Sequence, residues 1–197
     1  MRENCTSVFK MHSIKRLLKY AILILVFAAV LFIRTYVVRL ALVSGESMYP
    51  TLLNGDIVVI NQMNYAPARS DIVLIDVSDK PIRGAYIVKR IIAVEGDTVT
   101  LDYENDSIFV NDTKISEPYL NLDQEDPMQA LDAPISITYQ VPIGTVFVMG
   151  DNRNYSLDSR DSVLGMISES DILGRVCRRI PITQYFTKFS QCGTNII

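Results

Sequence analysis

The chain has 197 residues, 49% of them apolar, which is enough for one domain with a substantial core. The formal net charge of -3 hides an asymmetry, because residues 1–40 contain seven Lys or Arg and one acid, whereas residues 41–197 contain 12 Lys or Arg and 21 acids. An acidic body excludes nucleic acid as its expected partner, and a basic head on an acidic body fits a chain whose two parts lie on opposite sides of a membrane.

The first predicted element is an apolar helix over residues 17–38. Its uninterrupted apolar part, 20–33, has 14 residues, fewer than the about 20 that span a bilayer. Lys19 and Arg34 can extend their charges to the two interfaces and so lengthen the usable span. We therefore expect a transmembrane anchor.

The alternatives to an anchor are a cleaved signal peptide and a buried helix. A signal peptide ends in a small-x-small cleavage site, but here the apolar part runs into Ile33, Arg34, Thr35 and Tyr36. We favour an uncleaved anchor, flanked by a cytoplasmic basic tail over 1–16 and an extracytoplasmic domain over 39–197. The basic residues before the apolar part set this orientation.

The rest of the chain is dominated by short runs rich in Val, Ile, Tyr and Thr, separated by turn-forming residues. Residues 121–142 contain three prolines and are expected to form a long loop. The fold class is therefore mainly β, with a single all-β domain built as a sandwich or a distorted barrel. The expected strands are 56–60, 71–76, 86–94, 97–103, 107–110, 144–149 and 171–177.

The only histidine, His12, precedes the apolar helix, so the body has none. Its absence excludes Ser-His-Asp, Cys-His and ordinary zinc sites from the body. The three cysteines have no metal-ligand spacing, and Cys177 and Cys192 either pair or remain free thiols. A nucleophilic site in the body must then use a carboxylate, a tyrosine or a lysine as its base.

The segment SGESMYPT at 44–51 follows the helix directly. Ser47 lies beside Gly45 in a stretch that Pro50 keeps from being a helix interior. Such a bend can expose a hydroxyl and direct backbone N–H groups at an oxyanion, although a plain turn is the alternative. Nine residues separate Ser47 from Val38, so Ser47 lies within roughly 30 Å of the membrane surface.

In a strand over 86–94, Lys89 shares an apolar face with Ile87 and Ile91. Burial disfavours an ammonium ion and lowers the pKa of its lysine, which yields the neutral amine that a base requires. The alternative is an edge strand whose lysine reaches water.

The polar segment GDNRNYSLDSR at 150–160 follows a predicted strand. Ser156, Asp158 and Arg160 alternate, so in an extended chain they project to one side. An Asp-Arg pair there can fix the local fold and leave Ser156 free to bond a nearby amine. A solvated loop is the alternative.

Together these segments resemble the bacterial type I signal peptidases with a Ser-Lys dyad, in the short form of Gram-positive members. The resemblance covers most of the body in the family's order behind an apolar helix, and rests on residues 44–51, 55–60, 86–97 and 141–167. It implies an N-terminal transmembrane helix followed by an all-β catalytic domain, and a serine endopeptidase that needs no metal or organic cofactor.

The resemblance also implies residue roles. Ser47 would be the acylating nucleophile, Lys89 its general base, and Ser156 the residue that orients the lysine. Asp158 with Arg160, Asp151 and Met48 would support the site. The backbone N–H of Ser47 would be the main oxyanion donor, with Ser44 as the candidate second donor, because Gly45 stands where some relatives have a serine.

The implied function is the removal of signal peptides from secreted preproteins. The implied partners are those signal peptides, the lipid bilayer and a nearby secretion translocase, with no nucleic acid. One rival is a self-cleaving repressor-type Ser-Lys peptidase, which is soluble and has a DNA-binding head. The other rival is a membrane-tethered β domain that binds peptides without cleaving them.

Overall fold

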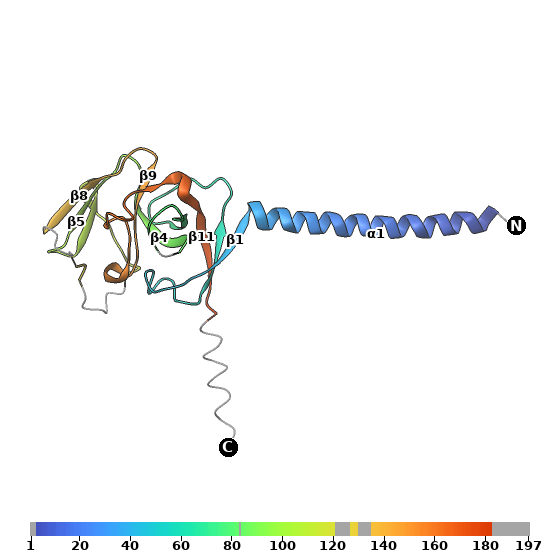
Figure 1. Ribbon diagram of the computed structural model, residues 1–197, viewed down its shortest axis with the longest axis horizontal. Coiled ribbons are helices and arrows are strands. Elements are labelled where there is room, and N and C mark those ends of the chain that lie inside the picture. Colours follow the sequence, from blue (N-terminus) through green and yellow to red (C-terminus); the bar gives the residue numbers. More distant parts are fainter. Residues whose placement is uncertain (1–2, 83, 121–126, 130–134, 183–197) are drawn as a thin grey trace, which may run out of the picture. The chain divides into compact units, whose positions relative to one another are not determined.

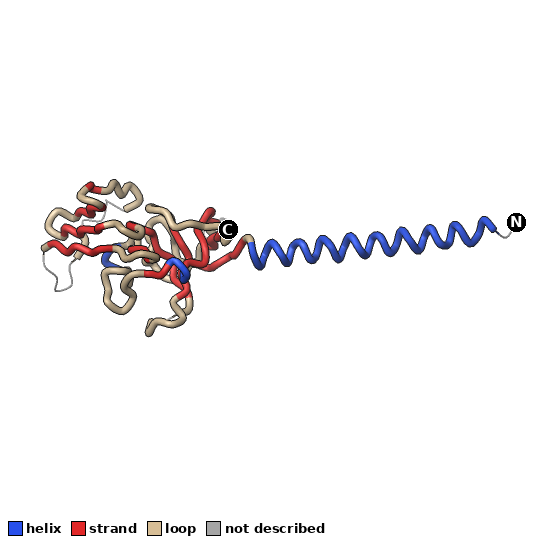
Figure 2. The backbone as a smooth tube through the Cα atoms, turned by 90° about the horizontal axis from the view of Figure 1, so that it is seen from above, coloured by secondary structure: helices blue, strands red, loops and turns tan. Residues whose placement is uncertain are grey.

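The computed structural model describes residues 3–82, 84–120, 127–129 and 135–182. The chain divides into two compact units, Met1–Arg39 and Leu40–Ile197. One helix makes up most of the first unit, and the second unit is built from short strands joined by loops (Figures 1 and 2).

The first unit contains helix α1, Glu3–Tyr36. It begins earlier than the apolar run, because residues 3–16 contain no Gly or Pro that would end a helix. It also ends two residues before the predicted limit, since Val38 already belongs to a strand. Within the described residues, the chain has no helix that combines the length and the apolar character needed to cross a membrane.

The second unit is built on two β-sheets. The larger has the strand order β1-β2-β11-β3-β4-β9-β10, and the smaller β7-β6-β5-β8. Their strands are β1 (Val38–Leu42), β2 (Ile57–Asn61), β3 (Ile72–Asp76), β4 (Tyr86–Ala93), β5 (Thr98–Asp102), β6 (Ser107–Val110), β7 (Thr113–Lys114), β8 (Ser136–Gln140), β9 (Thr145–Met149), β10 (Ile167–Ser168) and β11 (Ile172–Ile180). The mainly β fold class is confirmed.

The prediction of a loop over 121–142 is wrong for the residues of strand β8. Residues Ser136–Gln140 pair with β5 in antiparallel register, from Ser136 opposite Asp102 to Gln140 opposite Thr98. The prolines of the range flank this strand, so they do not interrupt its ladder. Residues 121–126 and 130–134 of the expected loop lie outside the described residues. The short strands β1, β7 and β10 were also not predicted.

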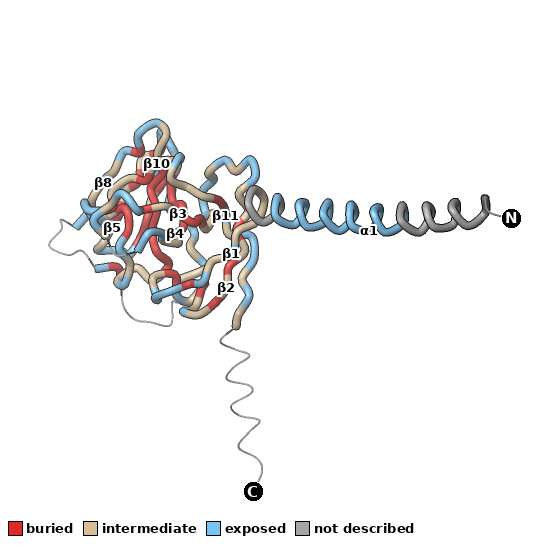
Figure 3. Tube along the Cα trace, turned by 45° about the vertical axis from the view of Figure 1, so that its right-hand side comes forward, coloured by how far each residue is buried: buried red, intermediate tan, exposed pale blue. Residues whose placement is uncertain are grey.

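Three clusters of buried apolar side chains form the core of the second unit, and Figure 3 shows buried stretches along the central strands. One cluster joins the two sheets through Phe147 of β9 and Leu101 of β5. Another combines β2 and β3 with Met48 and Leu52, from the segment that contains Ser47. Full burial of each such side chain contributes about 1.5–3 kcal/mol, so that segment is fixed against the core.

The structure describes one of the two cysteines that the sequence offers for a disulfide. Cys177 of β11 is an exposed free thiol, and its Sγ donates to the carbonyl oxygen of Val59 at 3.2 Å. Cys192, its candidate partner, lies outside the described residues.

Candidate active site

Ser47 lies in the loop between β1 and β2, which is closed on itself by backbone hydrogen bonds. The N–H of Val43 donates to the carbonyl oxygen of Asp56 at 2.8 Å, and the N–H of Gly55 donates back to Val43 at 2.9 Å. Met48 and Leu52 are each 2% exposed, so both point into the core. The adjacent hydroxyl of Ser47 is held at a half-buried position by this anchoring.

The turn that carries Ser47 requires the glycine two residues before it. Gly45 has φ +98°, a conformation that residues with a Cβ rarely adopt. Its N–H donates to the Asn54 side chain at 3.2 Å, and the N–H of Tyr49 donates to the Glu46 carbonyl at 3.0 Å. Ser44, the candidate second oxyanion donor, is exposed and has no side-chain hydrogen bond to the described part of the chain.

Lys89 lies in β4 opposite Val73 of β3. It is 4% exposed, and its Nζ donates a hydrogen bond to Ser47 Oγ at 2.8 Å. Burial lowers the pKa of Lys89 from 10.5 to about 8, against the opposing charge of Asp158. At pH 7 about one lysine in ten is then a neutral amine in contact with the Ser47 hydroxyl.

The polar segment after β9 is organised around Asp158, which is 1% exposed. Its carboxylate accepts the backbone N–H of Gly150 at 3.0 Å. It also accepts two hydrogen bonds from Arg160, Nε at 2.8 Å and Nη2 at 2.9 Å. The Asp158 carboxylate therefore closes the loop 150–158, and Arg160 holds that carboxylate in place.

Ser156 and Ser47 approach each other closely across Gly150. A Cβ added to Gly150 would lie 2.2 Å from Ser156 Oγ and 2.4 Å from the Ser47 carbonyl oxygen, so only glycine fits between them. Ser156 Oγ is buried and has no hydrogen-bond partner among the described residues. The expected hydrogen bond from Ser156 to Lys89 is thus not formed in this structure.

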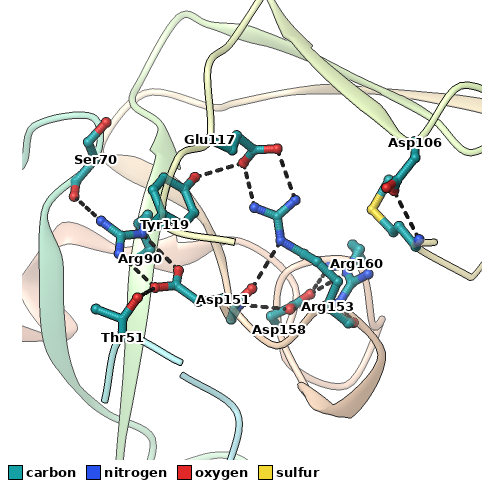
Figure 4. A network of polar contacts seen from close by, with 12 residues as sticks. Thr51, Ser70, Arg90, Asp106, Glu117, Tyr119, Asp151, Arg153, Asp158 and Arg160 are labelled. Atoms are coloured by element: carbon teal, nitrogen blue, oxygen red, sulfur yellow. Dashed lines mark hydrogen bonds and ion pairs between the residues drawn. The ribbon is translucent and has the colours of Figure 1, made fainter. Parts of the chain in front are cut away.

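Arg90, the residue after the lysine, connects three segments of the site (Figure 4). Its guanidinium donates two hydrogen bonds to Asp151, at 2.8 and 2.6 Å, and one to the Ser70 carbonyl at 2.8 Å. The same carboxylate accepts the hydroxyl of Thr51, and the ring of Tyr119 covers the guanidinium at 3.7 Å. These contacts tie the nucleophile loop to β4 and to the segment after β9.

A second arginine, Arg153, extends this network towards the smaller sheet. It donates to both carboxylate oxygens of Glu117, which also accepts the Tyr119 hydroxyl at 2.7 Å. Its Nε donates to the Gly150 carbonyl at 3.1 Å. Sequence reasoning missed Arg90, Arg153, Glu117 and Tyr119. For Arg90 a signal was available: it is a charged residue inside the apolar strand 86–94, and a buried arginine requires a partner.

The geometry combines a serine hydroxyl, a buried lysine with a lowered pKa and a backbone N–H on a tight turn. These are the groups that acyl transfer through a covalent intermediate requires. The described part of the chain contains no cluster of His, Cys, Asp and Glu that could hold a metal ion.

The sequence model of the family described as "Signal peptidase, peptidase S26" matches residues 14–180. The chain belongs to this family. It is 40% identical over 162 residues to signal peptidase I T of Bacillus subtilis, covering 78% of this chain and 79% of that one. It is also 34% identical over 195 residues to signal peptidase IB of Staphylococcus aureus, covering 91% and 98%. The predicted enzyme class, a serine endopeptidase, is confirmed.

A crystal structure of a signal peptidase I from Enterococcus faecalis is also similar to this chain. It matches with a TM-score of 0.45 and 28% identity, covering 57% of this chain and 97% of that one.

Proposed function

We propose that this protein removes N-terminal signal peptides from secreted preproteins through an acyl-enzyme formed on Ser47, with Lys89 as the general base. The observation that carries the proposal is the 2.8 Å contact between the Ser47 hydroxyl and a lysine amine that is 4% exposed. Membership of the signal peptidase family supports the same reaction.

In the proposed first half-reaction, the neutral amine of Lys89 takes the proton of Ser47 as the hydroxyl oxygen attacks the scissile carbonyl carbon. The backbone N–H of Ser47 donates to the oxyanion. Lys89, now protonated, gives its proton to the leaving amine as the peptide bond breaks. The products are an ester between the signal peptide and Ser47, and the free mature N-terminus. Lys89 then takes a proton from the water that attacks the ester carbon, and it returns this proton to Ser47 Oγ as the ester bond breaks and the signal peptide leaves with a free carboxylate.

The sheet provides a place for the extended substrate. Strand β9 pairs with β4 only from Arg90 to Ala93, and β3 pairs with the other edge of β4 from Tyr86 to Arg90. On the β9 side, Ile87–Lys89 have no strand partner in the part of the chain that the structure describes. We propose that the preprotein adds as a strand at this edge, with small side chains at the first and third positions before the cut.

The remaining residues have supporting roles in this proposal. Met48 fixes the nucleophile turn by its burial, and Asp151 joins that turn to β4 through Arg90. Asp158 with Arg160 holds the loop that contains Ser156. Ser156 would orient the amine of Lys89 when substrate binds, which its unpartnered buried hydroxyl allows.

We also propose that α1 attaches the enzyme to the membrane, with the N-terminus cytoplasmic, the β unit outside and the secretion translocase nearby. The large apolar side chains from Leu17 to Phe32 support attachment, since they are all exposed on the helix. Resistance to alkaline extraction would support it, as would protease sensitivity of the β unit in intact cells stripped of their wall. Release by alkali would refute the anchor.

The catalytic proposal is tested by incubating the detergent-solubilised full chain with a preprotein and sequencing the products. Ser47→Ala and Lys89→Ala should each abolish cleavage. Lys89→Arg should also be inactive, because an arginine is not neutral near pH 7. Ser78→Ala and Lys114→Ala, at exposed positions, are the matched controls. Cleavage that survives at Ser47→Ala would refute the mechanism, and binding without cleavage by the wild type would favour the peptide-binding rival.

A further inference from the structure

A cavity of about 530 Å³ adjoins the nucleophile turn. It is lined by Glu46 and Tyr49, on either side of Ser47 in sequence, by Leu53 farther along the same loop, and by Asn152 and Tyr155 from the segment after β9. None of the strand β4 residues lines it.

The wall of this cavity is hydrogen-bonded to the nucleophile turn. The backbone N–H of Asn152 donates to the Ser47 carbonyl at 3.0 Å, and its side-chain amide donates to the Glu46 carbonyl at 3.1 Å. The cavity is therefore held next to the turn that carries the Ser47 hydroxyl.

The side chains around the cavity are available to a ligand. Tyr155 is 72% exposed and Tyr49 38% exposed. The carboxylate of Glu46 has no ion-pair partner among the described residues. Two aromatic surfaces beside an unpaired carboxylate form a site that suits a chain with a basic side chain.

The direction of the substrate decides which part of it reaches this cavity. In the proposed function, the residues before the cut occupy the open edge of β4 beside Lys89. The residues after the cut must then leave Ser47 on the side that lacks β4, where the cavity lies.

We propose that this cavity binds the first residues of the mature protein, and that Glu46 makes the enzyme prefer a lysine or arginine within three residues after the cut. The inference rests on the proposed function and adds a specificity determinant to it. An exposed ion pair of this kind corresponds to a preference of roughly two- to fivefold in kcat/KM.

The test uses peptides with one cleavage region, in which each of the first three positions after the cut is Lys, Ala or Glu in turn. At one of the three positions, the wild-type chain should cleave the Lys peptide with a higher kcat/KM than the Glu peptide. In Glu46→Gln the two kcat/KM values should become similar. In Glu46→Lys the Glu peptide should be cleaved with the higher kcat/KM. Glu104→Gln, at an exposed turn between β5 and β6, is the matched control and should keep the wild-type order.

A second substrate isolates the cavity from the rest of the site. It has the same residues before the cut and a small amide leaving group in place of the residues after it. Tyr155→Ala and Glu46→Lys should cleave this substrate at the wild-type rate, while they cleave the peptides more slowly or with altered preference. An unchanged Lys preference in Glu46→Lys would overturn the inference. Failure of the wild type to cut any peptide would instead refute the proposed function.

Discussion

Asn152 and Ser47 are joined through their backbones: the N–H of Asn152 donates to the carbonyl oxygen of Ser47 at 3.0 Å. This contact holds the segment after β9 against the nucleophile turn. It depends on Gly150, two residues earlier, because a side chain at that position would occupy the space between Ser47 and Ser156.

We therefore expect Gly150→Ala to destabilise the β unit by about 2 kcal/mol or more and to lower kcat by over tenfold. The new methyl group would lie 2.4 Å from the Ser47 carbonyl oxygen, which is backbone and cannot rotate away. Urea unfolding and peptide cleavage measure the two effects. Adding Ser156→Gly should give only partial recovery, and full recovery would show that Ser156 alone makes the clash.

The pH dependence of kcat/KM should have an acid limb with an apparent pKa near 8. Only the neutral amine of Lys89 can take the Ser47 proton, and burial lowers the pKa of that lysine to about 8. The rate should rise about tenfold per pH unit below that value and level above it. A rate that stays flat from pH 6 to pH 9 would contradict a lysine base.

Lys89→Met should inactivate the enzyme and stabilise it by about 1–2 kcal/mol near neutral pH. The lysine is buried, and its lowered pKa means that folding disfavours its charged form. The wild-type unfolding free energy should rise between pH 8 and 10.5, because over this range the unfolded chain binds more protons at this residue. Thermal unfolding across that range should show the rise in the wild type and a smaller one in Lys89→Met.

Arg90→Lys should lower the free energy of unfolding by about 2–4 kcal/mol, because lysine cannot make two parallel hydrogen bonds to Asp151 and also stack on Tyr119. The side chains of Arg90 and Asp151 are 9% and 0% exposed. Arg175→Lys is the matched control, since the Arg175 side chain is 48% exposed in its pair with Asp71. The control should lose less than about 0.5 kcal/mol. Equal losses would show that burial does not set the strength of these pairs.

Ser156→Ala should reduce kcat by about tenfold to a hundredfold without lowering stability. Its hydroxyl is buried without a partner among the described residues, so its removal costs no hydrogen bond in the resting enzyme. A kcat measurement beside a thermal unfolding curve separates the two effects. Wild-type kcat would remove Ser156 from the mechanism.

Local patterns were sufficient to predict most strands, but they left the burial of Lys89 open. The alternation of apolar residues along 86–93 put this lysine on an apolar strand face, with an exposed edge strand as the alternative. Its pairing with Ser47 was expected only from the family resemblance. Strand β8 was missed because the prolines around it suggested a loop. Only the tertiary structure shows that they flank a strand that pairs with β5.

The network around Arg90 could not be predicted, for a different reason. Its partners Asp151 and Tyr119 come from other segments of the chain, and no spacing in the sequence relates them. The close approach of Ser156 and the Ser47 carbonyl to Gly150 likewise brings together segments that are distant in the sequence.

The unpaired edge of β4 at Ile87–Lys89 limits the conformation of the preprotein that the proposed enzyme can bind. Strand β9 pairs with β4 from Arg90 onward, whereas Ile87–Lys89 pair with β3 on one side and present the other edge, which a substrate must complete. A preprotein can complete it only if the residues before its cut are straight for the length of that gap. If the substrate binds at this edge as proposed, a helix or a folded domain that begins too close to the cut would protect the bond, and the enzyme would select chains that have not yet folded as well as short side chains.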